Sequence, residues 1–102
     1  MNDSSNVLTS ALEAALVREL ANHWKHANDS YFRGALRLPL ILLSDTEHRL
    51  GRWIPHERTI EISRKLVVST PWGVTVEVLK HEMAHQFVHE VMHETAETAH
   101  GP

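Results

Sequence analysis

The stretch VLKHEMAH, from Val78 to His85, decides how the rest of the sequence is interpreted. On an α-helix, residues four apart project side by side, one turn apart along the axis. His81 and His85 would then lie close enough to share one metal ion. Glu82 would be displaced by about 100° around the axis, near the metal without being a ligand. The stretch therefore predicts a helix that carries a metal site.

The residues around this stretch extend the predicted helix from Pro71 to about Glu94. A hydroxyl from Ser69 or Thr70 can cap its start, and proline suits the first helical position. Apolar residues recur along one side of the segment at Val74, Val78, Leu79, Met83, Phe87 and Val91. Helix propensity is lowered by Gly73 and by several β-branched residues, so packing of the apolar side must hold the helix.

Upstream, the chain alternates between one long helical pattern and short strand patterns. Residues 3–30 carry a stripe of apolar residues at every fourth position, which predicts an amphipathic helix. Residues 38–43 form a short apolar run typical of a strand, and residues 49–63 resemble a hairpin. Together these segments predict an α+β fold with two helices and a three-stranded, mostly antiparallel sheet. Its strand at Ile60 to Ser63 is expected at an edge, where an extended peptide could be added.

Composition narrows the kind of protein. The chain has 102 residues, 42% of them hydrophobic and 23% charged, as in a single globular domain. No cysteine is present, so any metal must be bound by histidines and carboxylates. The longest apolar run, Leu38 to Leu43, is too short to cross a membrane, and a cytoplasmic location is expected. The net charge of −3 argues against strong attraction to nucleic acid.

The reaction that the motif predicts is metal-assisted hydrolysis of a peptide bond. Zinc held by His81 and His85 would lower the pKa of its bound water, and Glu82 would accept the proton as general base. The alternative is a histidine face without metal, because His89 and His93 continue the same spacing and the chain contains nine histidines. The location within an amphipathic helix favours the zinc site.

The third zinc ligand is the open question of the sequence. A catalytic zinc has three protein ligands and one open position. On a straight helix, His89 and His93 lie too far along the axis to complete the site. Glu94, Glu97 and His100 are the remaining candidates, because the chain has room to turn back before them, and Gly101-Pro102 permits a sharp reversal beside His100.

Several motifs in order along the chain resemble those of the SprT-like metallopeptidases, which include the Spartan proteases. They are Trp24, Asn28, Tyr31-Phe32-Arg33-Gly34, Leu36, Leu38-Pro39, Arg49-Leu50-Gly51, Ile60-Glu61-Ile62-Ser63, the stretch at 78–85, and His100-Gly101-Pro102. The resemblance implies a minimal zincin fold, in which the N-terminal helix and the metal-binding helix pack on the small sheet. It also implies that His81, His85 and His100 bind zinc and that Glu82 is catalytic.

The resemblance leaves two further functions open. The family's third ligand opens another helix, so we expect residues 1–102 to be a single domain truncated at its C-terminus. A noncatalytic metal-binding or protein-interaction module with the same fold is therefore the alternative to an endopeptidase that acts on proteins or peptides. Association with DNA is implied only by the family, because the DNA-binding segments that many members carry downstream are not present in this sequence.

Three aromatic residues have both a structural and a functional interpretation. Trp53 and Trp72 could line a substrate groove, but core or rim positions are favoured. Tyr31 could donate to an oxyanion, although a buried structural phenol is favoured.

Overall fold

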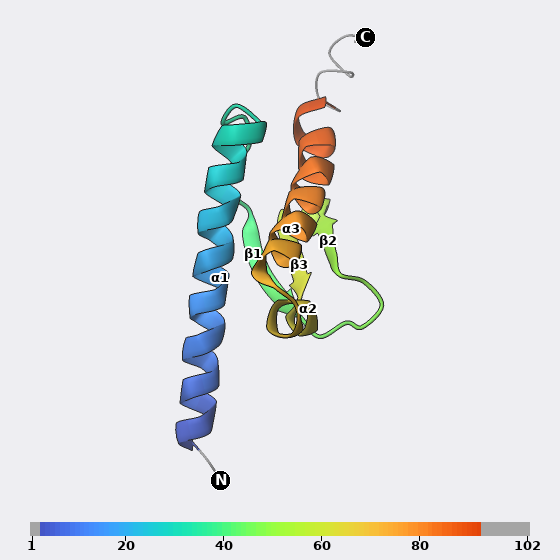
Figure 1. Ribbon diagram of the computed structural model, residues 1–102. Helices are drawn as coiled ribbons and strands as arrows, with labels where there is room; N and C mark the ends of the chain where they lie inside the picture. The colour runs from blue at the N-terminus through green and yellow to red at the C-terminus, as the bar shows by residue number, and fades with distance from the viewer. Residues whose placement is uncertain (1–2, 93–102) are drawn as a thin grey trace.

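The structure is a computed structural model that describes residues 3–92. In chain order its elements are helix α1 (Asp3–Tyr31), strands β1 (Leu40–Ser44) and β2 (Gly51–Ile54), the 3-10 turn η1 (Pro55–Glu57), strand β3 (Thr59–Ser63), helices α2 (Arg64–Ser69) and α3 (Trp72–Phe87), and the π-helical turn η2 (Val88–Met92). Figure 1 shows α1 beside the sheet and α3 in front of it. The predicted α+β class is confirmed.

The three strands form a mixed sheet in the order β1-β3-β2. β2 and β3 pair antiparallel, as the hairpin pattern predicts, whereas β1 and β3 pair parallel. The parallel pair arises because β2 runs opposite to β1 at the far edge and β3 then returns between them. The sheet therefore has one parallel pair where the sequence led us to expect mostly antiparallel pairing.

β3 is the central strand, so the prediction that Ile60 to Ser63 form an edge is wrong. Ile60 and Ile62 are fully buried. Thr59 and Ser63 are buried as well, and only Glu61 is partly exposed, as befits a strand with a neighbour on each side. The alternation of apolar and polar residues in the sequence does not distinguish a central strand from an edge strand. The free edges belong to β1 and β2.

Helices α1 and α3 cover the same face of the sheet. That face carries Ile41 and Leu43 from β1 beside Ile60 and Ile62 from β3. The helices contribute buried residues at helical spacing, namely Leu20, Trp24 and Ala27 from α1 and Leu79 and Met83 from α3. This single apolar cluster fixes α3, and with it the predicted metal site, against the sheet.

The N-terminal part of α1 extends past the sheet and past α2 (Figure 1). The predicted helix is confirmed, and Leu20 and Trp24 of its apolar stripe are buried. Leu12, however, is 58% exposed. The neighbouring Glu13 pairs with Arg64 of α2, so the other elements contact a different side of that turn.

Helix α2 was not predicted, and it changes how α3 begins. The Ser63 hydroxyl accepts a hydrogen bond from the Leu66 N–H (3.2 Å) and caps α2. The Thr70 hydroxyl donates to the Leu66 carbonyl (2.7 Å) and closes the same helix. The predicted hydroxyl cap of α3 is therefore wrong, because Pro71 is the N-cap residue and provides no side-chain hydrogen bond. In the part of the chain that the structure describes, no helix has the length and apolar character needed to cross a membrane.

Candidate metal centre and active site

His81 and His85 occupy successive turns of α3, and their imidazole rings converge. Their Nε2 atoms are 3.2 Å apart, and the ring planes meet at 82°. Both residues are exposed. The helical spacing therefore brings two metal-binding nitrogens to one accessible point.

This separation fits zinc. For zinc–nitrogen distances of about 2.0–2.1 Å, two nitrogens 3.2 Å apart subtend an angle of roughly 100° at the metal, close to tetrahedral. The imidazole nitrogens are also donors that zinc prefers in a chain without cysteine. His81 and His85 therefore suit two positions of a zinc site.

The remaining candidates for a third ligand, Glu94, Glu97 and His100, lie outside the described residues. Within residues 3–92, no group of three or more histidine, aspartate or glutamate side chains could hold a metal ion. Completion of the site by one of these three residues stays a prediction.

Glu82 follows His81 on α3, displaced by about 100° around the axis, and is only 6% exposed. It faces β2 at Gly51, where strand and helix approach closely. A Cβ atom on Gly51 would lie 3.2 Å from Glu82 Cγ and 3.0 Å from Val78 Cγ1. Glycine thus allows β2 to pack directly on the catalytic candidate, a contact that a side chain would prevent.

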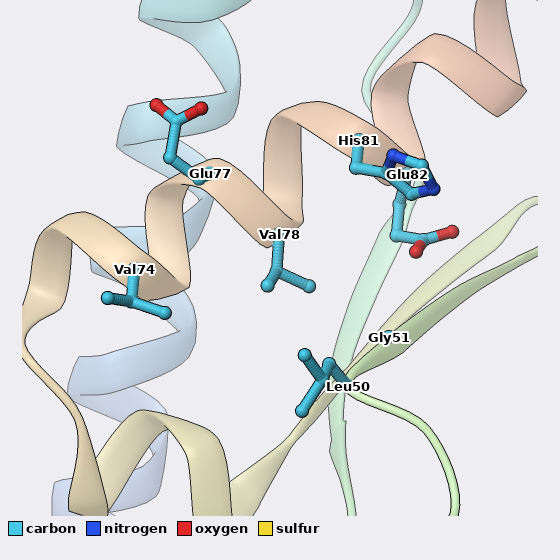
Figure 2. A pocket seen from close by; sticks show the side chains of 7 residues that line it. All are labelled: Leu50, Gly51, Val74, Glu77, Val78, His81 and Glu82. Atoms are coloured by element: carbon cyan, nitrogen blue, oxygen red, sulfur yellow. The ribbon is translucent and has the colours of Figure 1, made fainter.

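An open groove of about 440 Å³ lies between α3 and the start of β2. Its lining residues are Leu50, Gly51, Val74, Glu77, Val78, His81 and Glu82. Figure 2 shows Val74, Val78 and Glu82 directed toward Leu50 and Gly51, with Glu77 directed away. The groove therefore leads along the helix to two of the predicted site residues.

The turn that follows His85 is held by a network of hydrogen bonds. Gln86 is fully buried and donates to the carbonyl of Arg37 and to Glu90 (both 3.0 Å), while it accepts from the Trp24 indole (3.3 Å). Arg58 binds both oxygens of Glu90, at 2.6 and 2.9 Å. These residues connect α1, the β2–β3 turn and η2, so they fix the end of the helix that carries the histidines.

Sequence reasoning missed this network. The available signal was Gln86, a polar residue seven positions after Leu79 and three after Met83, and therefore on the buried side of the helix. A buried amide needs hydrogen-bond partners. Its partners come from segments distant in sequence, which periodicity does not reveal.

Arg58 lowers the pKa of Glu90 below its ordinary value of 4.5 through these hydrogen bonds, and Gln86 adds to the effect. Because the pKa is lower in the folded state than in the unfolded state, the ionised carboxylate stabilises the fold above about pH 4.5. That stabilisation is lost as the pH falls through the pKa of the folded state.

Replacing Glu90 with Gln should lower the free energy of unfolding by about 1–3 kcal/mol at neutral pH, because Arg58 loses a charged partner. The loss of stability on acidification should also be smaller in the variant. Denaturant unfolding at neutral pH and near pH 4 measures both effects. Glu47→Gln, at a side chain that is 76% exposed, is the control. Equal loss of stability on acidification in the Glu90 variant and the original chain would contradict a stabilising role for the ionised Glu90 carboxylate.

Replacing Gly51 with Ala should push β2 away from α3. The new Cβ would meet the Glu61 backbone oxygen at 3.1 Å as well as Val78 and Glu82, and overpacking of this kind costs about 1–3 kcal/mol. Thermal unfolding measures the loss. Gly73→Ala is the control, because nothing lies within 4 Å of its Cβ position and the higher helix propensity of alanine should leave the stability equal or raised. An unchanged melting temperature for the Gly51 variant would show that the strand does not press on the helix.

The aromatic residues lie outside the groove. Trp53 and Trp72 pack partly buried against the core, as favoured, and the Trp72 indole donates to His23 Nε2 (2.7 Å). Tyr31 is 64% exposed and lies under the Lys80 ammonium, 4.7 Å from the ring centroid. The prediction of a buried phenol is therefore wrong, because Tyr31 ends α1 on the side away from the core.

The fold and this motif define a general class. An α+β domain in which a His-Glu-x-x-His helix packs on a small sheet is zincin-like. A sequence model of the SprT-like family matches residues 20–102, and the chain belongs to that family. The family is zinc-associated and protease-related. No curated protein and no solved structure shows a significant match to the chain.

Proposed function

We propose that this chain is a zinc-dependent endopeptidase in which His81, His85 and His100 bind the metal and Glu82 is the general base. The observation that carries the proposal is the pair of imidazole nitrogens 3.2 Å apart, with the buried Glu82 next to His81 and on the groove. Membership of the SprT-like family supports it. The proposed partner is an unfolded protein or a peptide.

The position of Glu82, beside His81 and on the groove, supports a role as proton carrier. When bound, zinc supplies a Lewis acid that polarises the substrate carbonyl and lowers the pKa of a water. The Glu82 carboxylate takes the proton from the attacking water and passes it to the leaving amine. Because Val78 and Gly51 flank its side chain, the carboxylate has few other orientations. Restricted motion of this kind keeps the carboxylate oriented for both proton transfers.

The free edge of β2 is suited to bind the peptide backbone. The Leu50 carbonyl accepts from the Ser63 N–H (2.9 Å), so these two residues form a hydrogen-bonded pair. Such pairs alternate along an antiparallel ladder. The backbone groups of Gly51 and Trp53 therefore face the free edge, beside the groove that contains Glu82. An extended peptide could pair with them in any sequence, which suits an enzyme for unfolded proteins.

Cleavage of an unfolded protein tests the proposal. The chain should cut reduced, unfolded casein, a chelator should stop the reaction, and added zinc should restore it. A product pattern that is insensitive to the chelator would refute a zinc mechanism. Gel electrophoresis and mass spectrometry of the products distinguish cuts within the chain from trimming at its ends.

The alternative is a noncatalytic metal-binding module, which the exposure of both imidazoles favours. This alternative predicts zinc binding by calorimetry without cleavage at high protein concentration. Association with DNA stays a prediction from the family, and a salt-dependent shift of a DNA duplex would test it.

A further inference from the structure

The groove beside Glu82 has an apolar wall that the proposed chemistry does not use. Val74 and Val78 lie on one line of α3 that continues to Glu82, since all three are spaced by four residues. Leu50 lies opposite them, directly before β2. The three side chains form one apolar strip that ends at the proposed general base.

Two of the three side chains of the strip are exposed, and Val78 is partly buried. Leu50 is 57% exposed and Val74 is 43% exposed, although large apolar side chains are generally found inside. Apolar residues gathered in a concave surface beside polar groups are typical of a ligand site. An apolar ligand group would remove this surface from water.

Charge at the groove does not favour a basic ligand. The Glu77 carboxylate accepts a hydrogen bond from the Lys80 ammonium at 3.1 Å. Figure 2 shows Glu77 directed away from Leu50. The carboxylate is thus paired and directed away from the apolar strip, so the strip itself offers apolar contacts.

Helix geometry places the strip relative to the cleaved bond. Val78 lies four residues before Glu82, about 6 Å along the axis. An extended peptide advances about 3.3 Å per residue. A peptide on the β2 edge would therefore bring a side chain into the strip one or two residues from the bond that is cut.

We propose that Leu50, Val74 and Val78 form a specificity pocket that binds an aliphatic side chain, such as leucine or methionine, within two residues of the cleaved bond. This inference rests on the proposed function of the same site. The proposed pocket predicts a preference for certain substrate residues. Backbone pairing of the substrate with β2 alone would accept any sequence. The contact with an aliphatic group should favour leucine over glycine at that position by about tenfold or more.

A peptide library with random residues tests the preference by mass-spectrometric mapping of the cleavage sites. Leucine, isoleucine and methionine should be enriched within two residues of the cut. Leu50→Ala should reduce this enrichment by about fourfold or more, since each lost methyl group contributes about that factor. Leu12→Ala is a matched control, because Leu12 is 58% exposed and lies on α1. Val74→Ala, in the strip on α3, is a second test, and Val68→Ala, at an exposed valine on α2, is its matched control.

A second measurement separates the pocket from the catalysis. Binding of fluorescent peptides that differ only in leucine or glycine at one position is measured with Glu82→Gln, which should not turn them over. The Glu82→Gln variant should bind the leucine peptide more strongly than the glycine peptide, and the double variant Leu50→Ala, Glu82→Gln should lose this difference. That result supports the pocket even if the original chain cuts no peptide. A chain that cuts no peptide would refute only the proposed peptidase activity. Cleavage without residue preference, enrichment of charged residues, or equal binding of both peptides overturns the pocket.

Discussion

Replacing Glu82 with Gln should reduce peptide hydrolysis by about 10²–10⁴-fold, the usual contribution of a general base. Gln has the shape of Glu but cannot accept the proton of the attacking water. The side chain is buried between α3 and Gly51, so a substitution of equal size preserves the packing that a smaller residue would disturb. Initial rates on unfolded casein, followed by the release of new amino termini, give the ratio.

The metal site should be unchanged in this variant, because Glu82 is not a proposed ligand. Zinc titration by calorimetry should yield the same stoichiometry and affinity for Glu82→Gln as for the original chain. Glu47→Gln, on the exposed loop after β1, controls for the loss of one negative charge. Equal hydrolysis by the Glu82 variant and the original chain would exclude Glu82 as the base.

Replacing His85 with Ala should weaken zinc binding by more than about 100-fold, beyond the effect of losing an outer hydrogen bond to a ligand. One of the two nitrogens that lie 3.2 Å apart would be missing, and a single imidazole on α3 cannot hold the metal in the same way. Because His85 is exposed, the fold should survive the change. Competition with a chromogenic zinc chelator measures the affinity.

A histidine elsewhere on the surface provides the control for this experiment. His48 is exposed in the loop between β1 and β2, and His48→Ala should leave the tight site intact. The control matters because nine histidines can bind zinc weakly at several places. Equal zinc affinity in the two variants would show that His81 and His85 are not a metal pair.

Local sequence patterns were sufficient for the elements that carry the site. The four-residue spacing of apolar positions predicted α1 and α3, and the alternation at Ile60 and Ile62 predicted a strand. The same spacing placed His81 beside His85. All of these inferences depend on geometry within one helix or strand, which the chain expresses over a few residues.

Pairings between distant segments were beyond local patterns. The position of β3 between the other strands, and the parallel β1–β3 pair, depend on where the chain returns. Helix α2 was missed because it is short and is capped by Ser63, a residue that also ends a strand. The exposure of Leu12 shows the same limit, since a stripe predicts a face but not a partner for it.

The groove was also inaccessible to sequence reasoning. Val74 and Val78 were recognised as apolar positions of the helix, but Leu50 belongs to another element. Leu50, Val74 and Val78 form one surface only because β2 approaches α3 at Gly51. A strand–helix distance of this kind is a property of the packed core.

The placement of β3 between β1 and β2 has a consequence for the order of folding. The β2–β3 hairpin joins neighbours in sequence and can form early, whereas β1 must wait for β3 before it has a partner. The contact between Trp24 and Gln86 spans 62 residues and closes the largest loop among the described hydrogen bonds. The turn that follows His85 is thus fixed only when α1 packs against α3. A nascent or partly folded chain should therefore have no functional site.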